Sequence, residues 1–111
     1  MKISTIVFTV LAMVLIFASC KKKNDALCIE ERIDIFTLEA CQTDATVRQY
    51  TFQNETVYSL HLGSCIVDGS DEILNVDCAT IGFVGGFAGT TDINGENFYT
   101  NATLEATLWS N

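Results

Sequence analysis

Four cysteines constrain the fold of this chain more than any other feature. They stand at Cys28, Cys41, Cys65 and Cys78, spaced 13, 24 and 13 residues apart. The spacing does not match a zinc ribbon, and the single histidine, His61, offers little further ligation, so a metal site is disfavoured. A small domain buries too little apolar surface to be stable through its core alone, and disulfides often supply the difference. We therefore predict two structural disulfides.

The amino-terminal residues predict the oxidising compartment in which such bonds form. Met1-Lys2 precedes an apolar run over 6–18, which has the length of a secretory signal and falls short of the roughly 20 residues of a transmembrane helix. The run ends in Phe17-Ala18-Ser19-Cys20, which resembles the lipobox of bacterial lipoproteins. That resemblance implies a signal peptide over 1–19 and acylation of Cys20. Assigning Cys20 to lipid also leaves an even number of cysteines for pairing.

Residues 20–25 then form a lipidated tether. Lys21 stands where an aspartate would retain a lipoprotein in the inner membrane of enteric bacteria, so outer-membrane delivery is favoured. Lys21-Lys22-Lys23 followed by Asp25 is weakly similar to the surface-export tether of Bacteroidota lipoproteins, and a solvated tether near anionic head groups fits equally well. The periplasmic or surface side of the membrane stays open.

Beyond the tether the chain is strongly acidic. From residue 25 onward it has fourteen carboxylates and two arginines, Arg32 and Arg48, for a net charge of −12. A surface of this charge offers no basic stripe to phosphates, which excludes nucleic acid as a natural partner. Contact of the domain itself with anionic lipid is disfavoured for the same reason. The membrane is expected as a partner only through the lipid anchor.

The remaining pattern, over 26–111, predicts one α+β domain. Apolar residues at helical spacing predict a helix over 26–39. Five β-rich segments predict strands, over 47–52, 56–62, 72–76, 79–87 and 102–109. Asn94-Gly95 predicts another hairpin. One amino-terminal helix followed by five or six short strands implies a helix packed on an antiparallel sheet.

The predicted elements favour one of the three pairings that four cysteines allow. An intact helix would hold Cys28 and Cys41 about 20 Å apart, whereas a disulfide needs Cα atoms within about 7 Å. A 28–41 bond, and the 65–78 bond that would accompany it, are therefore disfavoured. A hairpin returns Cys65 to the carboxyl end of the helix, and the next strand carries Cys78 back towards Cys28. We predict Cys41–Cys65 and Cys28–Cys78.

A series of short motifs runs along the domain. Its members include Cys28-Ile29-Glu30-Glu31, Val47-Arg48-Gln49-Tyr50, Cys65-Ile66-Val67-Asp68-Gly69, Gly85-Gly86-Phe87-Ala88-Gly89 and Trp109. Their order resembles a family of small Bacteroidota lipoproteins that is catalogued as a domain of unknown function. The resemblance covers most of 28–109. It implies a single envelope domain and supplies no activity and no catalytic residues.

No catalytic residue is predicted. A two-residue turn at Asn54-Glu55 would place His61 opposite Arg48 on a half-exposed strand face. Ser59 or Ser64 could stand near His61, but neither lies in the Gly-x-Ser-x-Gly context of a nucleophile elbow. We therefore expect a protein that is not an enzyme. Over 82–89 the glycines predict bulges or close backbone approach. Phe83 and Phe87 are then expected in the core, and the alternative is that they form the rim of a shallow groove.

The acidic loop over 68–77 is the best ligand candidate. It carries Asp68, Asp71, Glu72 and Asp77, and calcium takes 6–8 oxygen ligands. Its spacing departs from the EF-hand loop, so calcium is a candidate cofactor without a matching motif. The leading interpretation is a lipid-anchored, non-enzymatic binding or structural module of the cell envelope, with an envelope protein or a glycan as partner. The alternative is a calcium- or glycan-binding module that uses this loop and four aromatic residues, Tyr50, Tyr58, Tyr99 and Trp109.

Overall fold

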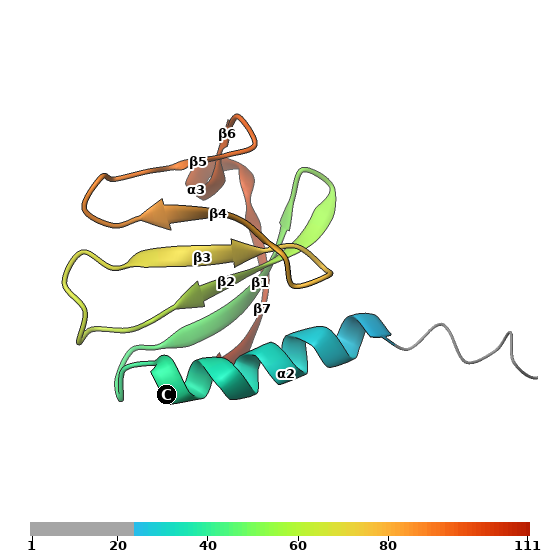
Figure 1. Ribbon diagram of the computed structural model, residues 1–111. Helices are drawn as coiled ribbons and strands as arrows, with labels where there is room; N and C mark the ends of the chain where they lie inside the picture. Colours follow the sequence, from blue (N-terminus) through green and yellow to red (C-terminus); the bar gives the residue numbers. More distant parts are fainter. Residues whose placement is uncertain (1–23) are drawn as a thin grey trace, which may run out of the picture.

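The computed structural model in Figure 1 describes residues 24–111. The predicted signal peptide, Cys20 and the lysines of the tether lie outside the described residues. The elements are α2 (Asn24–Glu39), β1 (Thr46–Phe52), β2 (Glu55–His61), β3 (Ser70–Leu74), β4 (Thr80–Gly85), β5 (Asp92–Ile93), β6 (Glu96–Asn97), α3 (Phe98–Asn101) and β7 (Thr103–Ser110). Over 24–111, no helix has the length and apolar character needed to cross a membrane.

Five strands form one antiparallel sheet in the order β4-β3-β2-β1-β7. In Figure 1, α2 lies along one side of this sheet, and the β5–β6 hairpin with α3 lies on the other side. The prediction of an α+β domain with one amino-terminal helix on an antiparallel sheet is confirmed. The short helix α3 was not predicted, because four residues are too few to show a helical period.

The helix side of the sheet holds the first hydrophobic core. Phe36 and Ile29 of α2 are buried, and Ile33 packs beside them. Their partners on the sheet are Val47, Tyr58, Leu60 and Leu74. Trp109 of β7 meets Phe36 edge to face, with ring centroids 5.9 Å apart. Burial of each large apolar side chain contributes about 1.5–3 kcal/mol, so α2 is held mainly by packing.

The opposite side of the sheet holds a second core around Phe98. Its ring lies 5.2 Å from that of Tyr50 and 5.3 Å from that of Phe52. The side chain of Asn97 caps α3 by accepting a hydrogen bond from the Thr100 amide at 3.1 Å. This second core also contains Val57, Ile73, Val84 and Ile93. The central strands are therefore buried on both faces over part of their length.

The β1–β2 turn differs from the prediction and changes the register. Gln53 and Asn54 occupy the turn, both with positive φ (52° and 61°), which is the backbone of a type I′ hairpin. Arg48 consequently pairs with Ser59, and His61 pairs with Thr46. The expectation that His61 stands opposite Arg48 is wrong, because the turn lies one residue earlier and shifts every cross-strand pair by two.

The two disulfides confirm the predicted pairing. Cys28–Cys78 and Cys41–Cys65 have Cα atoms 6.1 Å and 5.6 Å apart. One bond joins the first half of α2 to the turn after β3, and the other joins the chain just beyond α2 to the loop after β2. Gly63 lies beside the second bond with φ +107°, where an added Cβ would collide with the carbonyl oxygen of Thr43.

The phenylalanines of the glycine-rich segment do not enter a core. Phe83 of β4 is 51% exposed and Phe87 is 92% exposed. Gly85, Gly86 and Gly89 have positive φ, so the chain turns sharply after β4 and carries Phe87 out on a loop. The inward position on β4 belongs to Val84 instead.

Candidate functional site

A polar pocket opens on the sheet face opposite α2. It has a volume of about 400 Å³, and each of its lining residues bears a polar group. They are Asp44, Thr46, Arg48, Tyr50, Ser59, His61, Asp71 and Asn111. Alternation along β1 and β2 brings the side chains of these strands onto one face, and the pairing of Arg48 with Ser59 sets them side by side. We call this cavity the sheet-face pocket.

The pocket exists because the second core covers only part of this face. Phe52 and Val57, beside the β1–β2 turn, pack under α3 and the β5–β6 hairpin. The other end of the same strands carries Thr46 and His61, which line the open pocket. This face of the sheet therefore has an apolar half under α3 and a polar half that the second core leaves uncovered.

His61 and Asp71 form a short hydrogen-bonded pair in the pocket. Nδ1 of His61 lies 2.7 Å from Oδ1 of Asp71, across the β2–β3 pair. An ionised carboxylate only accepts hydrogen bonds, so Nδ1 carries the proton and donates to it. The Nε2 atom of a neutral His61 is then left as an acceptor. The His61 side chain is 45% exposed, so this acceptor is within reach of solutes.

Arg48 is the fixed cation of the pocket. Over residues 28–111, no carboxylate oxygen lies within 4.0 Å of its guanidinium, whereas Arg32 is paired with Glu72. Ser59, its cross-strand partner, is only 6% exposed. The pocket thus combines an arginine fork with hydroxyls and carboxylates, which together donate and accept hydrogen bonds.

Tyr99 lies next to the pocket although it does not line it. Burial raises the pKa of Tyr99 above its ordinary value of 10.0, and the negative charge of Asp71 and the neighbouring Tyr50 raise it further. The Tyr99 hydroxyl lies beside the end of β4, since a Cβ added at Gly85 would be 3.3 Å from it. Its ring is in contact with Phe98, at a centroid distance of 6.2 Å.

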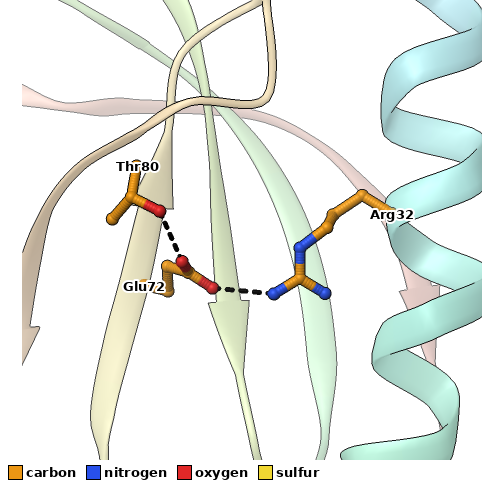
Figure 2. Close-up of polar contacts among 3 residues, drawn as sticks. All are labelled: Arg32, Glu72 and Thr80. Atoms are coloured by element: carbon orange, nitrogen blue, oxygen red, sulfur yellow. Dashed lines mark hydrogen bonds and ion pairs between the residues drawn. The ribbon is translucent and has the colours of Figure 1, made fainter.

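The helix side of the sheet carries a second polar cluster, shown in Figure 2. Nη2 of Arg32 donates to Oε1 of Glu72 at 2.9 Å, and the Thr80 hydroxyl donates to Oε2 at 2.6 Å. Both carboxylate oxygens of Glu72 are therefore engaged. The cluster links α2 to β3 and to the first residue of β4, with both ion-pair side chains 24% exposed.

The structure does not gather the acids of the 68–77 loop into one site. Asp71 and Glu72 are consecutive on β3, so they point to opposite faces, one towards His61 and the other towards Arg32. Asp77 lies in a turn in which its backbone amide donates a hydrogen bond to Oδ1 of Asn75 at 3.0 Å. In the described part of the chain, no group of three or more histidine, cysteine or acidic side chains is arranged to hold a metal ion.

The four aromatic residues proposed for glycan binding are also divided between the faces. Tyr58 and Trp109 belong to the helix side, where Tyr58 is buried. Tyr50 and Tyr99 flank Phe98 on the opposite side. Of the four, Tyr50 lines the sheet-face pocket. A sugar platform built from all four is therefore excluded by the fold.

Sequence reasoning missed this pocket although it singled out His61 and Ser59. The available signal was the alternation of polar residues at 46, 48 and 50 on β1 and at 59 and 61 on β2. The predicted turn at Asn54-Glu55 placed Arg48 opposite His61, whereas its partner in the structure is Ser59. Assigning Asp71 to a loop, where the structure has β3, concealed its contact with His61.

Comparison with known proteins identifies a family and no individual relative. No curated protein and no solved structure shows significant similarity to this chain. The family described as Domain of unknown function (DUF6970) matches residues 35–111, which span the end of α2 and every strand. The predicted resemblance to a domain of unknown function is thereby confirmed. The chain belongs to the DUF6970 family.

Proposed function

We propose that this protein is a lipid-anchored, non-enzymatic module of the cell envelope that binds a small polar ligand in the sheet-face pocket. The observation that carries this proposal is the pocket itself, about 400 Å³ and lined by polar residues alone. A small domain has few such places, because most of its inward-facing positions are needed for the core. Three strands supplying polar side chains to one concavity favour a ligand site over chance.

A saccharide is the ligand class that best fits this lining. Sugar hydroxyls both donate and accept hydrogen bonds, and the pocket offers donors from Arg48 and acceptors from Asp44 and Asp71. Tyr50 adds an aromatic surface at the border with the second core. The net charge of −12 from residue 25 onward disfavours polyanionic ligands.

The geometry offers less support for a hydrolase. Over the described residues, neither Ser59 nor Ser64 hydrogen-bonds to His61, and the Ser64 hydroxyl pairs with that of Thr43 at 2.8 Å. Nucleophilic catalysis requires a serine within hydrogen-bond reach of its base. The His61–Asp71 pair is better suited to orienting His61 towards a bound ligand.

The sequence around Cys20 supports the anchor and its outer-membrane address, and the anchor is tested by fatty-acid labelling. The substitution Cys20→Ser should abolish incorporation of a clickable fatty acid. It should also release the protein from the membrane fraction, because acyl chains provide the membrane affinity. Lys21→Ser is the matched control and should keep both the labelling and the membrane association. Labelling of the Cys20→Ser protein would refute the anchor.

Ligand binding is tested with a glycan array and with the purified protein. Arg48→Met should reduce binding of any saccharide hit at least about tenfold, since a lost charged hydrogen bond costs roughly 1.5–3 kcal/mol. Glu96→Gln, in the exposed β5–β6 hairpin, is the control and should bind normally. Hits that are unaffected by Arg48→Met and by Ser59→Ala would place the binding elsewhere and contradict the proposal.

A further inference from the structure

On the other face of the sheet, α2 leaves a groove uncovered. The helix packs on β1, β2 and β7, and it reaches β3 through Leu74 and the Arg32–Glu72 pair. The groove has a volume of about 380 Å³ and is lined by residues of α2, β2, β3, β4 and the loop before β3. Its apolar part consists of Phe36, Leu60, Leu62 and Phe83. Phe36 and Leu60 are buried, whereas Phe83 stands at the rim with half of its surface exposed.

Apolar surface continues beyond the groove on the helix. Ile35 is 53% exposed and lies one turn from both Arg32 and Glu39, which line the groove. On the opposite rim, Val67 precedes the groove residue Asp68 and is 85% exposed. Exposed apolar residues around a concave, partly polar surface are typical of a docking site. A partner that covers this apolar surface must therefore extend beyond the groove.

The charges of the groove select its occupant. Arg32 and Thr80 occupy both oxygens of Glu72, so this acid is compensated (Figure 2). Glu39 and Asp68 also line the groove, and among residues 24–111 neither has an arginine, lysine or histidine within 4.0 Å. The lining holds three carboxylates and one guanidinium, whose buried Nη1 has no hydrogen-bond partner among the described residues, so the net negative charge of the lining favours a cation on an apolar stem.

We propose that this groove docks a basic side chain of a polypeptide partner, flanked in that partner by apolar residues. The aliphatic stem would lie on Leu62 and Phe83, with its charged end between Glu39 and Asp68. Arginine suits the site best, because its guanidinium also stacks on an aromatic ring such as Phe83. The flanking apolar residues would cover Ile35 and Val67. This site is separate from the sheet-face pocket and does not depend on it.

The test uses the purified full-length protein in a neutral detergent and two short peptides with an uncharged fluorophore. One is Leu-Arg-Leu, capped at both ends, and the other carries citrulline, the neutral isostere of arginine. Fluorescence anisotropy should show saturable binding of the arginine peptide and at least about fivefold weaker binding of the citrulline peptide. Free agmatine should compete only weakly, since it lacks the apolar flanks.

Matched variants separate the local site from the general negative charge. Glu39→Gln with Asp68→Asn should weaken the arginine peptide about tenfold, as two partly exposed charge pairs are lost. Asparagine tolerates the positive φ of position 68, so this variant keeps the backbone. Glu55→Gln with Glu96→Gln removes the same charge from the hairpins and should bind within about twofold of the unmodified protein.

Several outcomes would overturn the proposal. Equal binding of the citrulline peptide would remove the cation requirement, and equal weakening by the hairpin control would leave only a long-range charge effect. If agmatine competes as well as the peptide, the groove binds a small cation and the proposed polypeptide partner is refuted. Binding of neither peptide up to millimolar concentration would also refute it.

Discussion

Breaking each disulfide separately should reveal how α2 is held. We expect Cys28→Ala with Cys78→Ala to lower the free energy of unfolding more than Cys41→Ala with Cys65→Ala. The first bond closes a loop with a sequence separation of 50 and the second a loop with a separation of 24. The chain-entropy relation then gives about 4 kcal/mol for the first bond and about 3.5 kcal/mol for the second.

These losses are large compared with the stability of so small a domain. At about 0.05–0.15 kcal/mol per residue, 88 described residues correspond to about 4–13 kcal/mol. Either double variant should therefore fold with reduced stability, and the variant lacking both bonds should be largely unfolded. A helix of 16 residues is only marginal by itself, so α2 should unfold with the sheet.

Urea unfolding followed by Trp109 fluorescence and far-ultraviolet circular dichroism measures both effects. Trp109 reports on helix docking because its ring packs on Phe36. Both signals should give one coincident transition in each double variant, at a lower midpoint. A loss below about 1 kcal/mol in either variant, with an unchanged dependence on urea, would refute the loop-closure argument.

Three further predictions concern the backbone, a tyrosine and calcium. Gly63→Ala should lower the free energy of unfolding in urea by about 2–4 kcal/mol, since its Cβ would meet a backbone oxygen. Gly89→Ala, also at positive φ but in open space, should lower it by only about 1–2 kcal/mol. Equal losses in the two variants would contradict the steric argument. Phenolate absorbance should show that the pKa of Tyr99 is raised above its ordinary value, and Asp71→Asn should reduce this shift. Because the folded state holds the tyrosine proton to higher pH than the unfolded chain, the free energy of unfolding should fall as pH rises through 10. Millimolar calcium should leave the melting temperature unchanged, because the acids of 68–77 are dispersed over two faces, and a rise would restore the calcium site.

The disulfide framework was predictable because it follows from the length of one helix and from the directions of the strands after it. The apolar period of α2 fixes its length, and length alone separates Cys28 from Cys41 beyond disulfide reach. That argument needs no exact strand register. It therefore survived errors of one or two residues at the strand ends, and both predicted bonds are present.

The register and the second layer were not predictable in the same way. Gln53 adopts positive φ without the intrinsic preference of glycine or asparagine, so the sequence did not locate the β1–β2 turn. Two further register shifts, where β1 pairs with β7, break the simple alternation of β7, leaving Leu104 and Leu108 exposed. Tertiary packing decides such positions, and local propensity does not.

The sheet-face pocket depends on this register more than on any motif. His61 meets Asp71 only because β3 begins at Ser70, two residues before the predicted start. Glu72, the next residue on β3, points to the helix side, where it pairs with Arg32. A displacement of one residue would exchange these two acids between the faces and remove both pairs.

The two faces consequently differ in charge although they share one sheet. Each arginine of the acidic domain serves one face: Arg32 compensates an acid in the groove, whereas Arg48 faces the pocket without a carboxylate within 4.0 Å over the described residues. Ile73 and Leu74, consecutive on β3 and almost completely buried, anchor the two cores from opposite sides. A strand packed on both faces has little freedom to shift, so we expect the two proposed sites to bind independently of each other. If both proposals hold, the polar ligand and the basic partner would lie on opposite faces of a single sheet.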